Sequence, residues 1–324
     1  MPSSDRVERR VKLRDLRVLL ALAQSGSMSR AAKQLAVSQP VVSKTIADLE
    51  HTLGVRLLDR SSRGVEPTVY GRALLNCGTA VFDELRRGLQ DIAFLSDPTV
   101  GELRVGGAGP FMDGLIPAVI SRLTARHRRL EFHVVESDVP ILCTLLRERR
   151  LDLAVFRMSG LMYSGDLDAE SLFDEPLLVV SGLNGRWSRR RAIDLGELVD
   201  EPWAMPEPDN VAMTLIADCF AAAGLKPPAP QVVSDSMAAR TRLVEMGPFL
   251  TFLPRSTLHF SAGRLRVKVL PVTLSMKAPP TQIVTLRNRT RNAIAKLFID
   301  EMHAISKPLK KGLRAATDGL KRRK

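Results

Sequence analysis

The chain has 324 residues, of which 45% are hydrophobic and 26% charged, and this composition is typical of a globular protein with a sizeable core. Its length predicts two domains and a smaller module. No apolar run approaches the roughly 18 residues of a transmembrane helix, and the N-terminal residues lack the apolar segment of a secretory signal. Three scattered cysteines outside any CxxC pattern indicate a reduced chain, so we expect a cytoplasmic protein that does not enter a membrane.

The net charge of +13 is concentrated at the two ends of the chain. Residues 1–66 carry 12 Lys and Arg against 7 Asp and Glu, residues 67–306 carry 28 against 27, and residues 307–324 carry 8 against 1. Basic ends on a neutral body favour a polyanionic partner, and nucleic acid is favoured over membrane because no basic segment has a strong apolar face. For the tail alone, solvated terminal charge is an equal alternative.

Three short helices are predicted after an N-terminal extension of residues 1–12. The first ends at Gly26, the second runs through AAKQLA, and the third begins at Ser38. Two helices separated by a few residues, with small residues at their contact, predict a helix-turn-helix at about 27–46. The segment VRLLDRSSRGVEPT then alternates weakly around a turn. It predicts a two-stranded wing, which completes a winged helix-turn-helix over residues 13–67.

Pro40 marks the start of the third helix. The apolar residues of this segment recur at helical spacing, namely Val42, Ile46, Leu49 and Leu53. A proline inside such a helix would cost about 3 kcal/mol or more. Ser38 suits the N-cap position, which makes Gln39 and Pro40 the first two helical residues, where a missing N–H group is unbonded anyway. The helix therefore presents a free N-terminus.

A long helix is predicted from about residue 68 to 97, because only isolated glycines interrupt its helical pattern. A lone helix that leaves a small domain cannot bury an apolar stripe by itself. We therefore expect it to be a linker and dimerisation helix. The predicted dimerisation residues are Leu74, Val81, Leu85 and Ile92.

Beyond the turn-rich segment SDPTVG, strands and helices alternate, which predicts parallel α/β architecture over residues 98–306. The segments LRVGG, LEFHVVE and LDLAVF are strands of a first unit, and PLLVVS, QVVS and FLTFL are strands of a second. TQIVTLRN and the final helix have the character of the first unit. We therefore expect lobe I at about 101–174 and 273–306, and lobe II at about 175–272. The chain would pass between the lobes twice, through two segments that we call the crossings.

Residues 307–324 are rich in basic side chains and contain two glycines, so little apolar surface is left to pack. Such a composition predicts a basic disordered tail.

Residues 13–75 strongly resemble the winged helix-turn-helix of LysR-type transcriptional regulators, through the segments GSMSRAA, SQPVVSKTI and LEHTLGVRLLDR. GELRVGG and RRLDLAVF resemble the effector domain of that family. The resemblance covers about residues 13–305. It implies an α+β multidomain fold, with an N-terminal winged helix-turn-helix, a long linker helix and a two-lobed α/β effector-binding domain like that of periplasmic binding proteins. Met28, Val41, Lys44 and Pro67 depart from the common pattern, but none removes a group that DNA binding needs.

The resemblance implies that the third helix enters the major groove with its N-terminus leading. There Gln39 can form paired hydrogen bonds with adenine, while its neighbours touch thymine methyl groups, bases or phosphates. Arginines of the wing suit backbone or minor-groove contacts, although Arg56 is interpreted as a solvated strand residue. The predicted DNA-binding residues are Ser29, Ser38, Gln39, Pro40, Val41, Ser43, Lys44, Arg60 and Arg63.

The resemblance also implies an effector cleft at the carboxyl ends of the strands. Its predicted residues are Gly107, Ala108, Ser137, Asp138, Val139, Arg157 and Asp209. Other interpretations stay open: GGAGP serves equally as a strand-to-helix turn, Arg157 as a surface ion pair, and Asp209 is favoured as a helix cap. Converging helix N-termini favour a small organic acid or sugar derivative as effector. GGAGP lacks the spacing of a nucleotide-binding loop, and the histidines and cysteines lack metal-ligand spacing.

The sequence therefore predicts a bacterial LysR-type DNA-binding transcriptional regulator that is not an enzyme and needs no cofactor or metal. Its predicted partners are double-stranded DNA with an interrupted inverted repeat, further copies of itself in a dimer or tetramer, RNA polymerase and a small-molecule effector. The alternative is a small-molecule-binding protein or enzyme in which the α/β portion carries the activity. The helix-turn-helix and the local positive charge, which an enzyme does not require, discriminate between the two.

Overall fold

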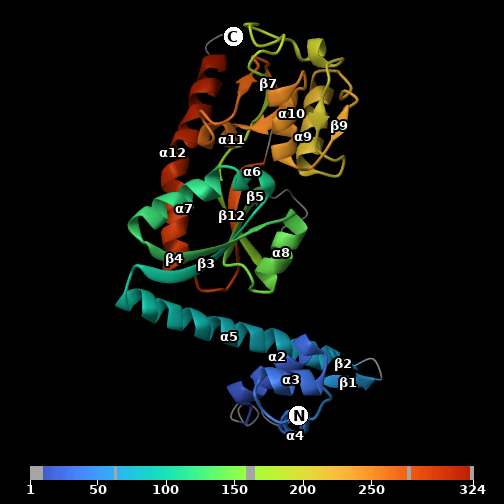
Figure 1. Cartoon of the computed structure of the whole chain (residues 1–324), viewed down its shortest axis with the longest axis vertical. Helices are drawn as coiled ribbons and strands as arrows, with labels where there is room; N and C mark the ends of the chain where they lie inside the picture. Colours follow the sequence, from blue (N-terminus) through green and yellow to red (C-terminus); the bar gives the residue numbers. More distant parts are fainter. Residues whose placement is uncertain (1–9, 62–63, 158–164, 276–278, 322–324) are drawn as a thin grey trace. The chain divides into compact units, whose positions relative to one another are not determined.

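The computed structural model describes residues 10–61, 64–157, 165–275 and 279–321, with the backbone alone for residues 60–61 and 311–321. The chain forms two compact units, residues 1–89 and 90–324, whose boundary falls inside one long helix (Figure 1).

The first unit is a winged helix-turn-helix, as predicted. Its elements are α2 (Leu13–Ser25), α3 (Met28–Gln34), α4 (Gln39–Leu53), β1 (Leu58–Ser61), β2 (Gly64–Pro67) and most of α5 (Val69–Ser96). Gly26 and Gly54 end α2 and α4 in the left-handed region, with φ of 63° and 70°, where glycine carries no steric penalty. The core is shared by α2, α3, α4 and the wing, through residues such as Leu22, Ala31 and Ile46.

Two polar side chains attach the wing and the long helix to this core. The Glu50 carboxylate accepts hydrogen bonds from the N–H groups of Leu57 at 2.7 Å and Leu58 at 3.2 Å, which fixes the start of the wing. The Thr68 hydroxyl accepts from the N–H of Gly71 at 3.0 Å and so caps α5. A Cβ atom at Gly71 would lie 2.0 Å from the Leu57 carbonyl oxygen, so only glycine permits this close approach.

The second unit contains two lobes. Lobe I has a five-stranded sheet in the order β4-β3-β5-β12-β6. Its strands are β3 (Val100–Gly107), β4 (Arg129–Glu136), β5 (Leu153–Arg157), β6 (Leu167–Phe173) and β12 (Thr281–Leu286). Strand β3 is parallel to β4 and β5, but β12 is antiparallel to β5 and β6. The predicted parallel arrangement is therefore confirmed for β3, β4 and β5 but not for β12, because the chain re-enters lobe I from lobe II in the opposite direction.

Helices cover both faces of this sheet (Figure 1). They are α6 (Gly109–Met112), α7 (Leu115–Arg126), α8 (Val139–Arg147) and α12 (Ala293–Lys321). On one face, α7 and α12 pack against strand residues such as Leu103, Val105 and Ile283. On the other face, α8 packs against Ala154 and Phe156. Because strand residues alternate between faces, both faces are buried, as the apolar sequence of β5 requires.

Lobe II has an antiparallel sheet in the order β10-β7-β11 and a parallel pair, β8-β9. Its elements are β7 (Leu177–Gly182), β8 (Ala204–Met205), α9 (Val211–Ala222), β9 (Val232–Val233), α10 (Met237–Met246), β10 (Thr251–Pro254), α11 (Arg255–Phe260), β11 (Val267–Val269) and the short helix η2 (Leu195–Leu198). Trp203 is fully buried, stacks on Phe252 and donates its indole N–H to the Leu198 carbonyl at 2.7 Å. This satisfied indole anchors the lobe II core.

Polar contacts join the two lobes near the crossings. The hydroxyl of Ser261 donates to the Asp113 carbonyl at 3.2 Å. The Arg255 guanidinium donates to the carbonyl oxygens of Asp174, at 3.3 Å, and Leu309, at 2.6 Å. Helix α12 therefore contacts lobe II as well as covering lobe I.

The prediction of a disordered tail after residue 306 is wrong as far as Lys321, because α12 continues to that residue. Leu309 is 3% exposed and belongs to the lobe I core, so the apolar stripe of the helix extends beyond the predicted boundary. Pro308 lies inside the helix, yet the surrounding packing maintains it. Of the helices in the described ranges, none is long and apolar enough to span a membrane.

Candidate functional site

The N-terminus of α4 is an exposed polar surface of the first unit. Gln39 and Pro40 occupy the first two helical positions, as predicted, and both are exposed. Ser38 occupies the N-cap position, but its hydroxyl makes no capping hydrogen bond, which corrects the expected capping role. The hydroxyl and the first helical N–H groups are therefore available to an external acceptor such as a phosphate.

A contact between helices holds Gln39 in place. The hydroxyl of Ser29, on α3, donates a hydrogen bond to Gln39 Oε1 at 2.9 Å. Because the amide oxygen already accepts this bond, the amide nitrogen of Gln39 remains available as a donor to DNA. Sequence reasoning proposed Ser29 as a direct DNA contact, whereas the structure adds a positioning role that only the fold reveals.

The remaining predicted residues of α4 divide by burial. Lys44 is exposed, while Val41 and Ser43 are half-buried beside the fully buried Val42 and Ile46. One helix face thus holds the core and the opposite face carries the predicted DNA contacts.

The wing is a two-stranded hairpin in which Arg60, on β1, pairs with Val65 on β2. The side chain of Arg60 and all of Arg63 lie outside the described residues. Placement of the wing arginines on DNA therefore stays a prediction.

Helix α5 carries an exposed apolar stripe. Val81 is 36% exposed, Leu85 45% and Ile92 63%, in line with their predicted role. Leu89, at 60%, and Leu95, at 80%, extend the stripe, and its spacings of three and four residues suit pairing with another helix. Leu74 differs, because it is half-buried against the core of its own winged helix.

In the second unit, the carboxyl ends of β3, β4 and β5 converge at one edge of the sheet. The Ser137 N–H donates to the Gly107 carbonyl at 3.3 Å, and the Ala108 N–H donates to the Val155 carbonyl at 3.1 Å. Val139 begins α8 beside them. A Cβ atom at Gly107 would lie 2.5 Å from Ile116 Cδ1 and 2.8 Å from Met112 Sδ, so a larger residue there would require these two side chains to move.

The two predicted aspartates lie on helix starts in different lobes. Asp138 is exposed at the N-cap position of α8 and its side chain makes no capping hydrogen bond. Asp209 is exposed too, but Asn210 is the N-cap of α9, with its side-chain oxygen accepting from the Ala212 N–H at 2.9 Å. The interpretation of Asp209 as a helix cap is therefore wrong by one position. In the described part of the chain, Asp209 makes no hydrogen bond or ion pair with the predicted lobe I residues.

Arg157 lies in a buried polar cluster at the crossings rather than in a surface ion pair. It ends β5, is 8% exposed and pairs in register with Thr281, the first residue of β12. Glu175, on the first crossing, is fully buried and accepts a hydrogen bond from the Ser256 N–H at 2.9 Å. Among the described residues, Arg157 Nη1 and Thr281 Oγ1 are buried without a hydrogen-bond partner.

Burial dominates the electrostatics of this cluster. It raises the pKa of the Glu175 carboxyl, against the hydrogen bond from the Ser256 N–H and the charge of Arg157, which lower it. Burial also lowers the pKa of the Arg157 guanidinium, against the charge of Glu175. Glu175, Ser256 and Thr281 were not predicted, because single polar residues next to strands carry no periodic signal.

The described residues contain no group of three or more His, Cys, Asp or Glu side chains that could hold a metal ion. The arrangement is a winged helix with an exposed helix N-terminus, followed by a two-lobed domain with buried polar groups at its crossings. It defines a class of protein: a DNA-binding regulator with a ligand-binding domain.

Comparison with known families gives the particular family. Residues 13–72 match the bacterial regulatory helix-turn-helix proteins of the lysR family, and residues 96–306 match the LysR substrate binding domain. The chain belongs to the LysR family of transcriptional regulators.

Relatives and solved structures agree with this assignment. The chain is 25% identical over 307 residues to the transcriptional regulator GbpR of Azospirillum brasilense, covering 94% of this chain and 90% of the relative. It is 29% identical over 261 residues to the regulator GalR of Pseudomonas putida, covering 81% and 66%. A full-length OxyR variant from Pseudomonas aeruginosa has a TM-score of 0.66 at 22% identity, covering 90% and 94%. CbnR bound to its target DNA has a TM-score of 0.54 at 20% identity, covering 92% and 100%.

Proposed function

We propose that this LysR-family regulator binds an interrupted inverted repeat as a dimer or tetramer, and that a small organic acid or sugar derivative modulates its action on RNA polymerase. The regulator works in the cytoplasm and catalyses no reaction. An acid is favoured over a neutral sugar because of one observation: Nη1 of Arg157 is buried and has no hydrogen-bond partner among the residues that the structure describes.

The DNA-binding part of the proposal rests on the exposed face of α4. Gln39 is held by Ser29 and leaves an amide donor at the helix N-terminus, where N–H groups and the helix dipole attract phosphates. Lys44 lies exposed further along the same helix. These groups combine base recognition with backbone attraction, which is what a sequence-specific site requires.

The dimer follows from the exposed stripe of α5. Leaving Leu85, Leu89, Ile92 and Leu95 in water is unfavourable, and a second copy of the helix would cover them. Two copies related by a twofold axis read two half-sites in opposite orientation. The operator is therefore an inverted repeat with a spacer.

The effector part rests on the convergence of Gly107, Ala108, Ser137 and Val139 at one edge of the sheet, with Arg157 at the end of the adjacent strand. A guanidinium binds a carboxylate through paired hydrogen bonds and gains strength when water is excluded. Asp138 and, from lobe II, Asp209 would bind hydroxyl groups of the same ligand. The ligand shifts the lobes only by its differential affinity for their two arrangements.

The test is titration calorimetry of the full-length protein with small carboxylates, hydroxy acids, sugar acids and neutral sugars. A carboxylate should bind saturably, and Arg157→Gln should weaken it at least tenfold. Glu301→Gln, a second buried charge that bonds Arg122 at 2.9 Å away from the crossings, is the matched control and should leave binding unchanged. Binding of a neutral sugar alone, or full affinity in Arg157→Gln, would show that Arg157 does not recognise the effector.

The regulatory part is tested by DNA binding and turnover. The protein should be retained on heparin and released by salt, should select its operator over random DNA, and should leave the ligand chemically unchanged. Conversion of the ligand, observed by mass spectrometry, would instead support an enzyme in which the α/β portion carries the activity.

A further inference from the structure

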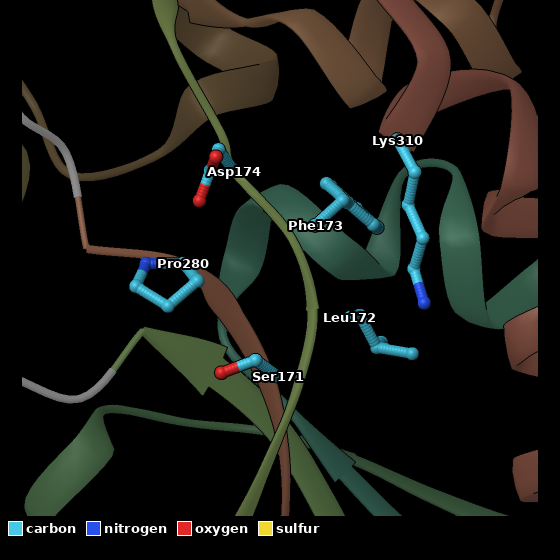
Figure 2. Close-up of a pocket in the computed structure, with 6 residues that line it drawn as sticks. All are labelled: Ser171, Leu172, Phe173, Asp174, Pro280 and Lys310. Carbon is cyan, nitrogen blue, oxygen red and sulfur yellow. The ribbon is translucent and has the colours of Figure 1, made fainter. Parts of the chain in front are cut away.

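A pocket of about 310 Å³ lies on the outer side of the crossings, apart from the predicted effector residues. It is lined by Ser171, Leu172, Phe173, Asp174, Pro280 and Lys310 (Figure 2). The first three belong to β6, Asp174 begins the first crossing, Pro280 precedes β12 and Lys310 lies on α12. No predicted effector residue is among them.

Burial distinguishes the two neighbouring carboxylates of the first crossing. Asp174 is exposed, whereas the next residue, Glu175, is fully buried against Ser256. The two neighbouring carboxylates therefore face opposite sides of the crossing segment. Arg157 is not among the residues that line the outer pocket.

Two charges of opposite sign line the pocket from two sides. Figure 2 shows Lys310 on one side of the segment 171–174, and Asp174 and Pro280 on the other. Both charged side chains are exposed, and neither makes an ion pair with another side chain in the described ranges. A ligand that lies across the segment can meet an ammonium group at one end and a carboxylate at the other.

The strand between them supplies further polar groups. Strand β6 is the edge of its sheet and hydrogen-bonds, within the described part of the chain, to β12 alone. Among the described residues its outer N–H and C=O groups have no strand partner and can bond a ligand, as edge strands do with extended partners. The exposed Ser171 adds a hydroxyl group that can donate or accept.

We propose that this pocket is a second binding site, whose ligand is a free α-amino acid. A zwitterion places its carboxylate on Lys310 and its ammonium on Asp174, while a simple anion would be repelled by Asp174 and a simple cation by Lys310. The pocket volume is at the lower end of the roughly 300–1,000 Å³ of small-molecule sites, which suits a ligand of amino-acid size.

The site is in a position to act on the lobes. Its lining residues come from the first crossing, the segment before β12 and α12. A bound ligand would contact all three segments and so favour one arrangement of the lobes. Lys310 lies outside residues 96–306, the segment matched by the family domain. The positive charge of the pocket therefore comes from the part of α12 that lies beyond the matched family domain.

The experiment is calorimetry of the full-length protein with each proteinogenic L-amino acid alone. At least one should bind with one ligand per chain, and Lys310→Gln and Asp174→Asn should each weaken it at least tenfold. For the tightest binder, the matching acid without the amino group and the matching amine without the carboxylate should each bind at least tenfold more weakly. Lys307→Gln and Asp300→Asn, exposed on the same helix outside the pocket, are the controls and should bind normally.

Ser137→Leu, in the predicted effector cleft, should leave amino-acid binding unchanged. Because Lys310 and Asp174 are exposed, their variants should keep the thermal unfolding temperature of the unliganded protein. The proposal is overturned if no amino acid binds saturably, if the deaminated acid binds as tightly, if both pocket variants bind at full affinity, or if Ser137→Leu abolishes binding.

Discussion

The winged-helix unit and the two-lobed unit place their recognition groups in opposite ways. On α4, Gln39, Pro40 and Lys44 are exposed on a convex helix over an apolar core. At the crossings of the second unit, Arg157 is 8% exposed and Glu175 fully buried. A polymer such as DNA must be met by projecting groups, whereas a small molecule is recognised by surrounding it, where low dielectric strengthens each charged contact.

The difference also decides which substitutions are informative. Exposed groups on α4 can be removed with little loss of stability, so their effects report on DNA directly. Removing one of two neighbouring buried charges leaves the other uncompensated and destabilises the fold. For the effector cleft, a change of shape at its edge is therefore the cleaner perturbation.

The largest effect on operator affinity is expected from substitutions in the apolar stripe of α5. They should leave a monomer that can bind only one half-site. Val81→Asp combined with Leu85→Asp should give monomers, because charges would be buried in the helix pair. Operator affinity should fall by about a hundredfold or more, since the second half-site contact becomes intermolecular. Analytical ultracentrifugation measures the assembly. Asn76→Asp, exposed elsewhere on the helix, is the control, and unchanged dimers in the double variant would show that another surface holds the subunits together.

The second effect separates ligand response from DNA binding. Ser137→Leu should remove the response to effector, because the larger side chain occupies the edge where strand ends converge, and should leave operator affinity without ligand unchanged. The lost coupling free energy between effector binding and operator binding is about 1–3 kcal/mol, which is typical of allosteric regulators. Anisotropy titrations with and without effector give this number. A full response in Ser137→Leu would place the effector elsewhere.

The third effect concerns base recognition. Gln39→Ala should cost about 1–3 kcal/mol at the operator and relax discrimination at one base pair. Ser29→Ala should cause part of this loss, because Gln39 would keep its amide but lose its hydrogen-bonded anchor. Competition between specific and random duplexes measures both. If the specificity ratio survives Gln39→Ala, the helix does not enter the groove as proposed.

The fourth effect is electrostatic and independent of sequence. Arg60→Ala should weaken all duplexes alike and reduce the slope of log affinity against log salt by about 1. Deleting residues 311–324 should also weaken binding to random DNA and leave the specificity ratio unchanged, because the basic side chains of this segment are attracted to phosphates of any sequence. This deletion keeps Leu309 in its core. If either variant lost operator binding but kept binding to random DNA, the substituted or deleted residues would not act through the DNA phosphates alone.

The smallest effect is a pH dependence of the buried cluster. Burial raises the pKa of Glu175 in the folded protein, so the native state binds this proton more tightly than the unfolded chain does. Stability should therefore decline as pH rises from the ordinary glutamate pKa through the raised one. Urea unfolding at several pH values should show this decline in the wild type and a flatter profile in Glu175→Gln. Parallel profiles would show that Glu175 does not titrate in this window.

The sequence by itself determined the features that local interactions decide. The serine, glutamine and proline at the start of α4, and the apolar spacing behind them, place the helix and its exposed face with no reference to the rest of the chain. Strands β3, β5, β7 and β12 are recognisable for the same reason, as short apolar runs between turns. The stripe on α5 follows from helical spacing, except that Leu74 is used by the core of its own domain.

The tertiary structure alone decided what depends on contacts distant in sequence. The antiparallel return of β12 brings Thr281 beside Arg157, and the crossing buries Glu175 against Ser256, although these four residues lie far apart in the chain. The same packing carries α12 through Pro308, because Leu309 finds a place in the lobe I core that no local propensity indicates. Local pattern specifies elements and their faces, but buried polar clusters and pockets arise only where the fold brings unrelated segments together, and no sequence window contains that information.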